Sequence, residues 1–171
     1  MYEKKDLMKT ITASAFKGIT EIEYFNFEED FVEKNIRCIP MIVRFKMDKA
    51  GIKLKLAEWN KFSVKERIEL AKKSCKNEEE AGQYKDYLTG MIKSYTRNEA
   101  TGLAIDQHPG WADMDKVPGL LQEKLKESGW YISLHQWVGL TNLQRFALLK
   151  LCRTGHESKN FPTALKEFGL I

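Results

Sequence analysis

The stretch IPMIVRFKMDKAGIKLKLAEWNKFSVKERIELAK at residues 39–72 decides the fold, because the chain contains a second version of it. The second version is VPGLLQEKLKESGWYISLHQWVGLTNLQRFALLK at residues 117–150, and the two align without a gap at an offset of 78 residues. Eight positions are identical: Pro40/Pro118, Lys46/Lys124, Gly51/Gly129, Leu56/Leu134, Trp59/Trp137, Arg67/Arg145, Leu70/Leu148 and Lys72/Lys150. Ungapped similarity of this kind indicates a repeated supersecondary unit.

The first part of each copy carries the signals of a helix. A proline at the first helical position presets φ and costs no hydrogen bond, and a glycine just past the end supplies a left-handed cap. The stretches from Pro40 to Gly51 and from Pro118 to Gly129 are therefore each predicted to be one helix.

Two further helices are predicted in each copy. Extended residues, 52–55 or 130–133, lead into a short helix with a leucine and a tryptophan three positions apart, which puts both on one face. These pairs are Leu56/Trp59 and Leu134/Trp137. The third helix begins with a capping box, in which a hydroxyl and an acid or amide satisfy free backbone amides. The boxes are Ser63-x-x-Glu66 and Thr141-x-x-Gln144.

The first copy taken alone also permits a β-hairpin. Apolar residues alternate with polar ones over 41–47 and again over 52–56, as in two strands that turn at 48–51. The second copy, PGLLQEKLKESG, has only the helical pattern, and copies without a gap are expected to share a fold. The helical interpretation is therefore preferred.

The segments outside the copies have simpler patterns. Asn77-x-x-Glu80 is a capping signal before a helix of about 18 residues whose apolar residues recur at helical spacing. They are Tyr84, Tyr87, Leu88, Met91, Ile92 and Tyr95. Residues 98–116 have no helical period and are predicted to form a long ordered loop. Residues 1–19 are predicted to be a loosely held arm.

An acidic, aromatic segment at residues 21–33 precedes the first copy. Its aromatic residues are expected to pack on the repeat. Glu28, Glu29 and Asp30 are consecutive, so a helix cannot make them converge on a metal ion, and they are expected to be surface acids.

Length and composition bound the architecture. With 171 residues, 43% of them hydrophobic, the chain can bury a core without disulfides or metal, and a single mostly α domain is predicted over residues 20–171. Its apolar runs are too short for a membrane span and its start does not resemble a signal peptide, so a cytoplasmic location is expected. Cys38, Cys75 and Cys152 contain no CxxC spacing and are interpreted as reduced core thiols.

Charge is unevenly distributed, although the net charge is only +4. Residues 20–37 contain six acids and two bases, whereas residues 44–76 contain eleven bases and four acids. A basic surface of this kind can dock an acidic partner, but a solvated helix face opposite the core is the commoner explanation. The candidate docking residues are Lys53, Lys55, Lys65 and Lys72.

Sequence motifs of catalysis are absent. The chain has no GxGxxG, Walker loop, GxSxG or HExxH motif, and it has no ExxH or HxxE pair, so no catalytic residue, metal ligand set or cofactor is predicted. One polar cluster follows Gly155, which is predicted to cap the last helix of the second copy. Its residues, with the arginine before the glycine, are the candidate binding residues Arg153, His156, Glu157, Lys159 and Asn160. A short terminal helix is predicted from Pro162 to Phe168, closed by Gly169.

The helix-turn-helix shape of each copy raises the alternative of DNA binding. A recognition helix needs polar side chains along one face. Residues 141–151 are apolar nearly all round and are expected to be buried, and only residues 64–76 are basic enough to touch phosphate. Nucleic-acid binding is therefore disfavoured.

Three stretches resemble the nitrate reductase associated protein family. They are FNFEEDFV at 25–32, IRCIPMIVRFKMDKAGIKLKLAEWNKFS at 36–63 and ISLHQWVGLTNLQRFALLKLCRTGHESKNFPTALKEFGL at 132–170. The family's polar run RxGHExxNF corresponds to Arg153, Gly155, His156, Glu157, Asn160 and Phe161. The resemblance implies association with nitrate assimilation and supplies no reaction, cofactor or catalytic residue.

The sequence with this resemblance predicts a non-catalytic accessory protein. Its expected partner is nitrate reductase or the machinery that assembles or regulates it. The alternative is an enzyme or small-ligand binder that uses the loop around His156. A concave apolar site at His156 or Glu157 would favour the alternative, and a flat charged or apolar patch would favour the accessory protein.

Overall fold

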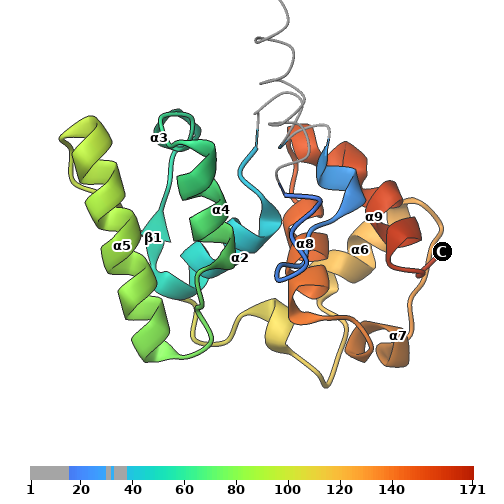
Figure 1. Ribbon diagram of the computed structural model, residues 1–171. Coiled ribbons are helices and arrows are strands. Elements are labelled where there is room, and N and C mark those ends of the chain that lie inside the picture. Colours follow the sequence, from blue (N-terminus) through green and yellow to red (C-terminus); the bar gives the residue numbers. More distant parts are fainter. Residues whose placement is uncertain (1–15, 30–31, 33–37) are drawn as a thin grey trace, which may run out of the picture. The chain divides into compact units, whose positions relative to one another are not determined.

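The structure is a computed structural model that describes residues 16–29, 32 and 38–171 (Figure 1). Contacts within the chain separate two compact units, residues 1–106 and 107–171. The described residues are mostly helical and contain one two-stranded sheet, which confirms that the fold is mostly α, while the internal repeat stays a prediction. Most of the predicted arm at 1–19 lies outside the described residues, as does Asp30. The prediction of a single domain stays a prediction.

Unit 1 is built around three packed helices. Its elements are η1 (Asn26–Glu28), α2 (Met41–Ala50), β1 (Ile52–Lys53), α3 (Leu56–Trp59), α4 (Val64–Lys72), α5 (Glu78–Thr96) and β2 (Thr101–Gly102). Helix α2 contacts both α4 and α5. Fully buried Val43, Leu70 and Leu88 come from these three helices, one from each. The Tyr84 hydroxyl donates to the Leu70 carbonyl at 3.0 Å, so the phenol also has a buried partner.

Helix α2 excludes the hairpin alternative. It ends at Gly51, whose φ of 69° is left-handed and whose N–H donates to the Met47 carbonyl. A Cβ at Gly51 would lie 2.8 Å from Ile105 Cγ1, so both the backbone conformation and the space require glycine. Pro40 is the residue before the helix, with ψ at 146°, which is one position earlier than predicted.

The segment before α2 differs from the prediction of surface acids. Glu28 is buried, and its carboxylate accepts hydrogen bonds from the Met41 N–H at 2.6 Å and from the Phe25 N–H at 3.2 Å. The Met41 N–H belongs to the first turn of α2, which has no internal acceptor. Glu28 therefore satisfies the start of α2 from a distant part of the chain, which sequence spacing did not indicate. Glu29 is partly exposed and pairs with Lys17 at 3.0 Å.

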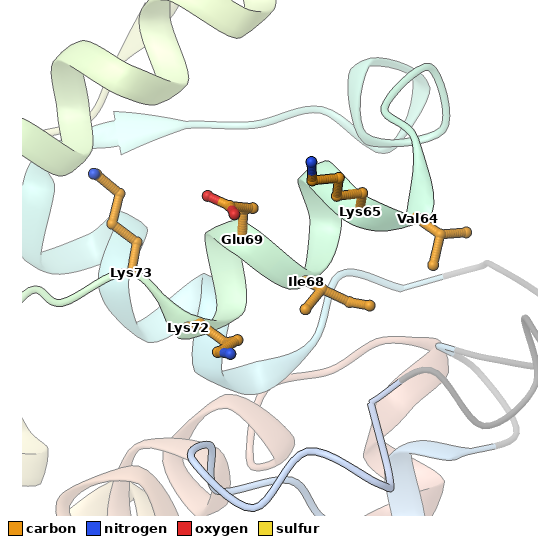
Figure 2. A pocket seen from close by; sticks show the side chains of 6 residues that line it. All are labelled: Val64, Lys65, Ile68, Glu69, Lys72 and Lys73. Carbon is orange, nitrogen blue, oxygen red and sulfur yellow. The ribbon is translucent and has the colours of Figure 1, made fainter.

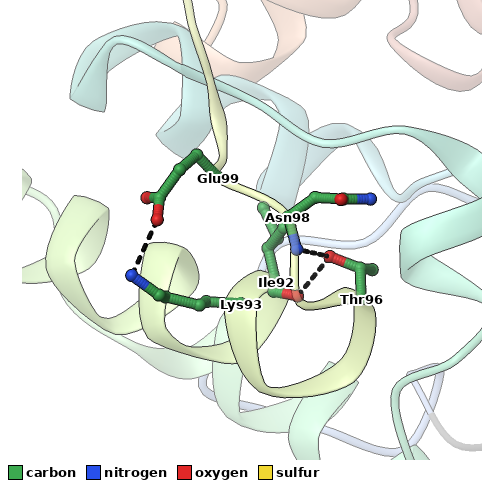
Figure 3. Close-up of polar contacts among 5 residues, drawn as sticks. All are labelled: Ile92, Lys93, Thr96, Asn98 and Glu99. Atoms are coloured by element: carbon green, nitrogen blue, oxygen red, sulfur yellow. Dashed lines mark hydrogen bonds and ion pairs between the residues drawn. The ribbon is translucent and has the colours of Figure 1, made fainter.

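The end of α5 shows why residues 98–116 are more than a loop (Figure 3). Arg97 is left-handed at φ 60°, and the Thr96 hydroxyl donates to the Ile92 carbonyl at 2.7 Å and accepts from the Asn98 N–H at 3.1 Å. Lys93 and Glu99 pair across the turn at 2.7 Å. The chain then forms β2, antiparallel to β1, with Ile52 opposite Gly102. A two-residue strand is too short for an alternating pattern, so the sequence did not predict this pairing.

Unit 2, like unit 1, contains a helix that directly follows a proline, Pro118. Its elements are η3 (Gly110–Ala112), α6 (Gly119–Glu127), α7 (Leu134–Val138), α8 (Asn142–Leu151), η4 (His156–Asn160) and α9 (Phe161–Glu167). Gly129 is left-handed at φ 71°, and the Trp130 N–H donates back to the Leu125 carbonyl at 2.9 Å. Six of the ten residues of α8 are buried, which confirms the expectation for residues 141–151.

The short helices bury tryptophan but not leucine. Trp59 and Trp137 are 1% and 0% exposed, whereas Leu56 and Leu134 are 37% and 42% exposed. The predicted burial of both tryptophans is confirmed. Leu56 and Leu134 are exposed because each is the first residue of its helix and side chains tilt toward the helix N-terminus, so no preceding turn covers them.

The C-terminal region corrects the prediction for Gly155. Helix α8 ends at Leu151 with Cys152 in the right-handed helical conformation, and Gly155 instead precedes η4. Residues 156–160 are a 3₁₀-helix rather than a loop, and the Ser158 hydroxyl donates to the Gly155 carbonyl at 2.8 Å. Helix α9 starts at the buried Phe161 and is followed by left-handed Gly169, close to the predicted terminal helix.

Candidate functional site

The outward face of α4 in unit 1 is a hollow with an apolar edge and lysines around it (Figure 2). Its volume is about 580 Å³. The lining residues all belong to α4 or its end: Val64, Lys65, Ile68, Glu69, Lys72 and Lys73. Val64 and Ile68 are half-buried, and Lys65, Glu69 and Lys72 are exposed.

Helical periodicity arranges these side chains in two adjacent rows along α4. At 3.6 residues per turn, positions 64, 68 and 72 follow one another along the helix, and positions 65, 69 and 73 form the adjacent row. Figure 2 shows Val64, Ile68 and Lys72 pointing to one side of α4 and Lys65, Glu69 and Lys73 pointing to the other. Leu70 and Ala71, on the opposite face, are fully buried in the core.

The N-terminus of α4 is fixed by Glu66. Its carboxylate accepts from the Ser63 N–H at 2.8 Å and from the Tyr95 hydroxyl at 2.7 Å, while the Ser63 hydroxyl accepts from the Glu66 N–H at 3.3 Å. This confirms the predicted capping box and adds a link to α5. The hydrogen bonds from the Ser63 backbone and the Tyr95 hydroxyl lower the pKa of Glu66. Hydrogen bonds of Glu66 to Ser63, just before the helix, and to Tyr95 on α5 therefore hold the first turn of α4.

The C-terminus of α4 is fixed by two lysines of α2. Lys46 donates to the Ala71 carbonyl at 2.5 Å, and Lys49 donates to the Cys75 carbonyl at 2.5 Å. Ammonium groups suit a helix C-terminus, where carbonyls lack internal partners and the helix dipole is negative. Lys46 is only 9% exposed, and burial lowers the pKa of Lys46 to about 8. Lys46 thus holds the last turn of α4, and Lys49 holds the segment just after it.

Lysines dominate the electrostatics of the α4 face, which carries three lysines and one glutamate. Lys72 forms an exposed ion pair with Glu21 at 3.2 Å. The Lys73 ammonium lies 4.9 Å from the centre of the Tyr87 ring on α5. Burial first, and the negative charge of Glu69 second, raise the pKa of Tyr87. The face therefore combines a positive charge excess with two half-buried apolar side chains.

The matched helix α8 of unit 2 has a different composition at the corresponding positions. At the offset of 78 residues, Lys65, Ile68, Glu69 and Lys73 correspond to Leu143, Phe146, Ala147 and Leu151. All four residues of α8 are buried, and α8 contacts α9 and η4 within its unit. The surface that is apolar and covered on α8 is therefore charged and open on α4.

The predicted docking residues separate into two pairs. Lys65 and Lys72 line the hollow, whereas Lys53 on β1 and Lys55 before α3 are exposed and do not line it. The sequence reading missed Lys73 and the apolar pair Val64 and Ile68. A helical wheel drawn over residues 64–73 would have placed all of them on one face, because the helix itself was predicted.

The other predicted binding residues lie at the end of unit 2. Arg153 and Lys159 are exposed, and Glu157 and Asn160 are half-buried in or next to η4. His156 is the first residue of η4. Helices α8 and α9 both contact η4, so two helices hold this segment. The hollow on α4 includes none of these residues.

Residues 16–29, 32 and 38–171 contain neither a metal-binding cluster nor a membrane-spanning helix. Within these ranges, no group of three or more His, Cys, Asp or Glu side chains could hold a metal ion. In the same part of the chain, no helix is long and apolar enough to cross a membrane. Cys38, Cys75 and Cys152 are free thiols, and burial raises the pKa of Cys152 to about 12.

Comparison with known proteins gives one match. The family model described as conserved nitrate reductase-associated protein matches residues 24–168, which includes both candidate segments. No curated protein and no solved structure matches the chain significantly.

Proposed function

The chain belongs to the conserved nitrate reductase-associated protein family, and from this premise we propose that it is a non-catalytic accessory protein of nitrate assimilation. Its partner is nitrate reductase or a protein that assembles or regulates that enzyme. The match spans most of the chain, so the association concerns the whole protein rather than one motif.

The observation that carries the proposal is the exposed face of α4. This face combines three lysines and Glu69 with the half-buried Val64 and Ile68 around a hollow, and Ile68 also packs against the core of unit 1. Apolar groups with a charged rim are typical of protein interfaces. Charges at the rim of an interface increase the association rate with an oppositely charged partner and help to orient that partner.

The repeat supports a division of roles between the two copies. We infer that residues 39–72 and 117–150 are copies of one unit, each with a helix after a proline, a left-handed glycine, a buried tryptophan and a capped third helix. The second copy uses the outer surface of its third helix for internal packing. The first copy leaves that surface to a partner.

Capture of nitrate reductase tests the proposed function. Tagged full-length protein is incubated with an extract that contains nitrate reductase, and the bound fraction is assayed for that enzyme by activity and mass spectrometry. We expect capture at low salt, with weakening as salt rises because exposed charges are screened. Absence of nitrate reductase and of its assembly proteins from the bound fraction would refute the proposal.

The segment Arg153–Asn160 is the second candidate contact. The supporting observation is that η4 is held between α8 and α9 while Arg153 and Lys159 stay exposed, since binding groups often lie on segments fixed by a rigid scaffold. Position 156 begins η4 and lies outside α8, which ends at Leu151. His156→Ala should change the free energy of unfolding by less than about 0.5 kcal/mol. Loss of capture in this variant would assign the contact to η4, and retained capture would exclude it.

A further inference from the structure

The hollow along the outward face of α4, lined by six residues of that helix and its end, is called the α4 groove. We propose that it binds an acidic amphipathic helix of the partner, laid along α4, with apolar side chains over Val64 and Ile68 and carboxylates at Lys65 and Lys72. This rests on the proposed function and names the chemistry that its contact requires.

The spacing of the apolar residues favours a helical partner. Val64 and Ile68 are four residues apart on a helix, which is about 6 Å along the axis at 1.5 Å per residue. An opposing helix repeats side chains at the same interval, so a pair at i and i+4 fits this edge. An extended peptide would gain little, because the backbone groups of α4 are used within the helix and cannot pair with a strand.

The charges set a register for that helix. Lys65 and Lys72 are seven residues apart, about 10.5 Å along α4, and Glu69 lies between them. The complementary helix therefore has two acidic residues seven positions apart with a basic residue between them. A helix with acids at random positions would place one of them against Glu69, which is unfavourable.

Helix α8 shows that this surface of the repeated unit accommodates neighbouring helical elements. The residues that match Lys65, Ile68, Glu69 and Lys73 are buried in unit 2, where α8 contacts α9. An apolar surface there suits permanent packing within the chain. A lysine-bearing surface on α4 suits a partner that arrives from water with the opposite charge.

Before the partner binds, Glu21 forms the ion pair with Lys72. The pair is exposed, with side chains 45% and 60% accessible, and such pairs contribute little stability. A partner carboxylate can replace Glu21 at this lysine. Removing the Glu21 charge should therefore strengthen binding, whereas a merely solvated lysine face would show no such gain.

The same features argue against nucleic acid as the occupant. Phosphate binding would favour an unbroken row of bases, but Glu69 interrupts the row and Val64 and Ile68 present apolar surface. A short DNA duplex therefore serves as a comparison ligand in the test.

Titration with synthetic peptides tests the inference on the full-length protein. The probe is a labelled helical peptide with glutamates seven positions apart, a lysine between them and leucines four positions apart on the adjoining stripe. One control peptide has the same composition in scrambled order, and a second has two interior prolines that prevent the helix. Fluorescence anisotropy gives Kd at two salt concentrations, and circular dichroism confirms that each protein variant is folded.

Four protein variants complete the design. Lys65→Glu with Lys72→Glu should weaken binding about tenfold, and Ile68→Asp should also weaken it, since each removes a contact at the groove. Glu21→Gln should tighten binding about 1.5- to 5-fold, as expected for release from an exposed ion pair. Lys85→Glu is the matched control, because Lys85 is exposed on α5 and does not line the hollow, and it should leave Kd almost unchanged.

The outcomes separate this inference from the proposed function. The proposed groove would be overturned if the scrambled peptide, the proline peptide or the DNA duplex bound as tightly as the patterned peptide. It would also be overturned if the Lys65→Glu/Lys72→Glu variant had the same Kd as wild type. If nitrate reductase is captured equally by wild type and by the Lys65→Glu/Lys72→Glu variant, the accessory function stands and the groove is wrong. If the peptide binds as expected but nitrate reductase is never captured, the groove stands and the proposed function falls.

Discussion

The guanidinium carbon of Arg145 lies 5.8 Å from the centre of the Trp137 ring. The same pair recurs in unit 1, where the guanidinium carbon of Arg67 lies 5.4 Å from the centre of the Trp59 ring. Both arginines also donate to main-chain carbonyls near the short helix that carries the tryptophan. In each unit, one arginine and one tryptophan thus join the short helix to the capped helix that follows it.

Trp137 should be essential for the stability of unit 2. Its side chain is fully buried and its indole N–H donates to the Asp113 carbonyl at 2.7 Å. Trp137→Ala should lower the free energy of unfolding by about 3–5 kcal/mol, the usual cost of deleting a large buried aromatic side chain. Urea denaturation measures this difference. Leu134→Ala on the same helix is the control, and because Leu134 is 42% exposed its effect should be much smaller.

Arg145 should not tolerate replacement by lysine. It is 4% exposed and donates to the carbonyls of Trp111 and Leu140 and to the Asn142 side chain. An ammonium cannot reproduce the planar fork, so at least one buried acceptor would lose its partner. Arg145→Lys should destabilise the protein by about 2–3 kcal/mol. Arg67→Lys should cost less, because Arg67 is only half-buried, and an equal loss in both variants would contradict this account.

Lys46 should make stability rise with pH between about pH 8 and pH 9. Burial holds the pKa of Lys46 near 8 in the folded chain, against 10.5 when unfolded, so in this window the unfolded chain binds the extra proton. Stability then increases with pH. Above pH 9 the raised pKa values of Cys75 and Cys152 act in the opposite direction, because the unfolded thiols release protons first.

The Lys46→Met variant isolates this effect. Urea midpoints of wild type and variant are compared at intervals from pH 7 to pH 9. The variant loses the hydrogen bond to Ala71 and is less stable throughout, but the difference between the two proteins should widen as pH rises. Parallel profiles would show that Lys46 does not titrate in this range.

Glu28 should stabilise the start of α2. Its carboxylate satisfies the N–H groups of Met41 and Phe25 in a buried setting. Glu28→Ala should lower the free energy of unfolding by about 1–3 kcal/mol, since it leaves a helix N–H without an acceptor. Glu29→Ala provides the comparison, because the Lys17–Glu29 pair is partly exposed and should contribute at most about 1 kcal/mol. A larger loss at Glu29 than at Glu28 would reverse the assignment.

Local signals in the sequence determined much of the helical structure. Gly51 and Gly129 are left-handed as predicted, and Pro40 and Pro118 each stand immediately before a helix, because these residues act through their own backbone conformations. The capping boxes at Ser63 and Thr141 and the cap at Asn77 form as predicted for the same reason. The lysines of α4 could also be assigned to one helix from their order alone.

Only the tertiary structure decided which groups meet across distant parts of the chain. The pairing of β1 with β2, the burial of Glu28 against α2, and the contact of Lys46 with Ala71 join residues that no local pattern connects. Gly155 was assigned to α8 because a glycine after an apolar helix usually caps it, yet the chain continues through Cys152 and uses Gly155 before η4. The burial of Leu70 and Ala71 in the core likewise identifies the outward face of α4 as a candidate site. The sequence could not show this, because which face of a helix is buried depends on how the other elements pack against it.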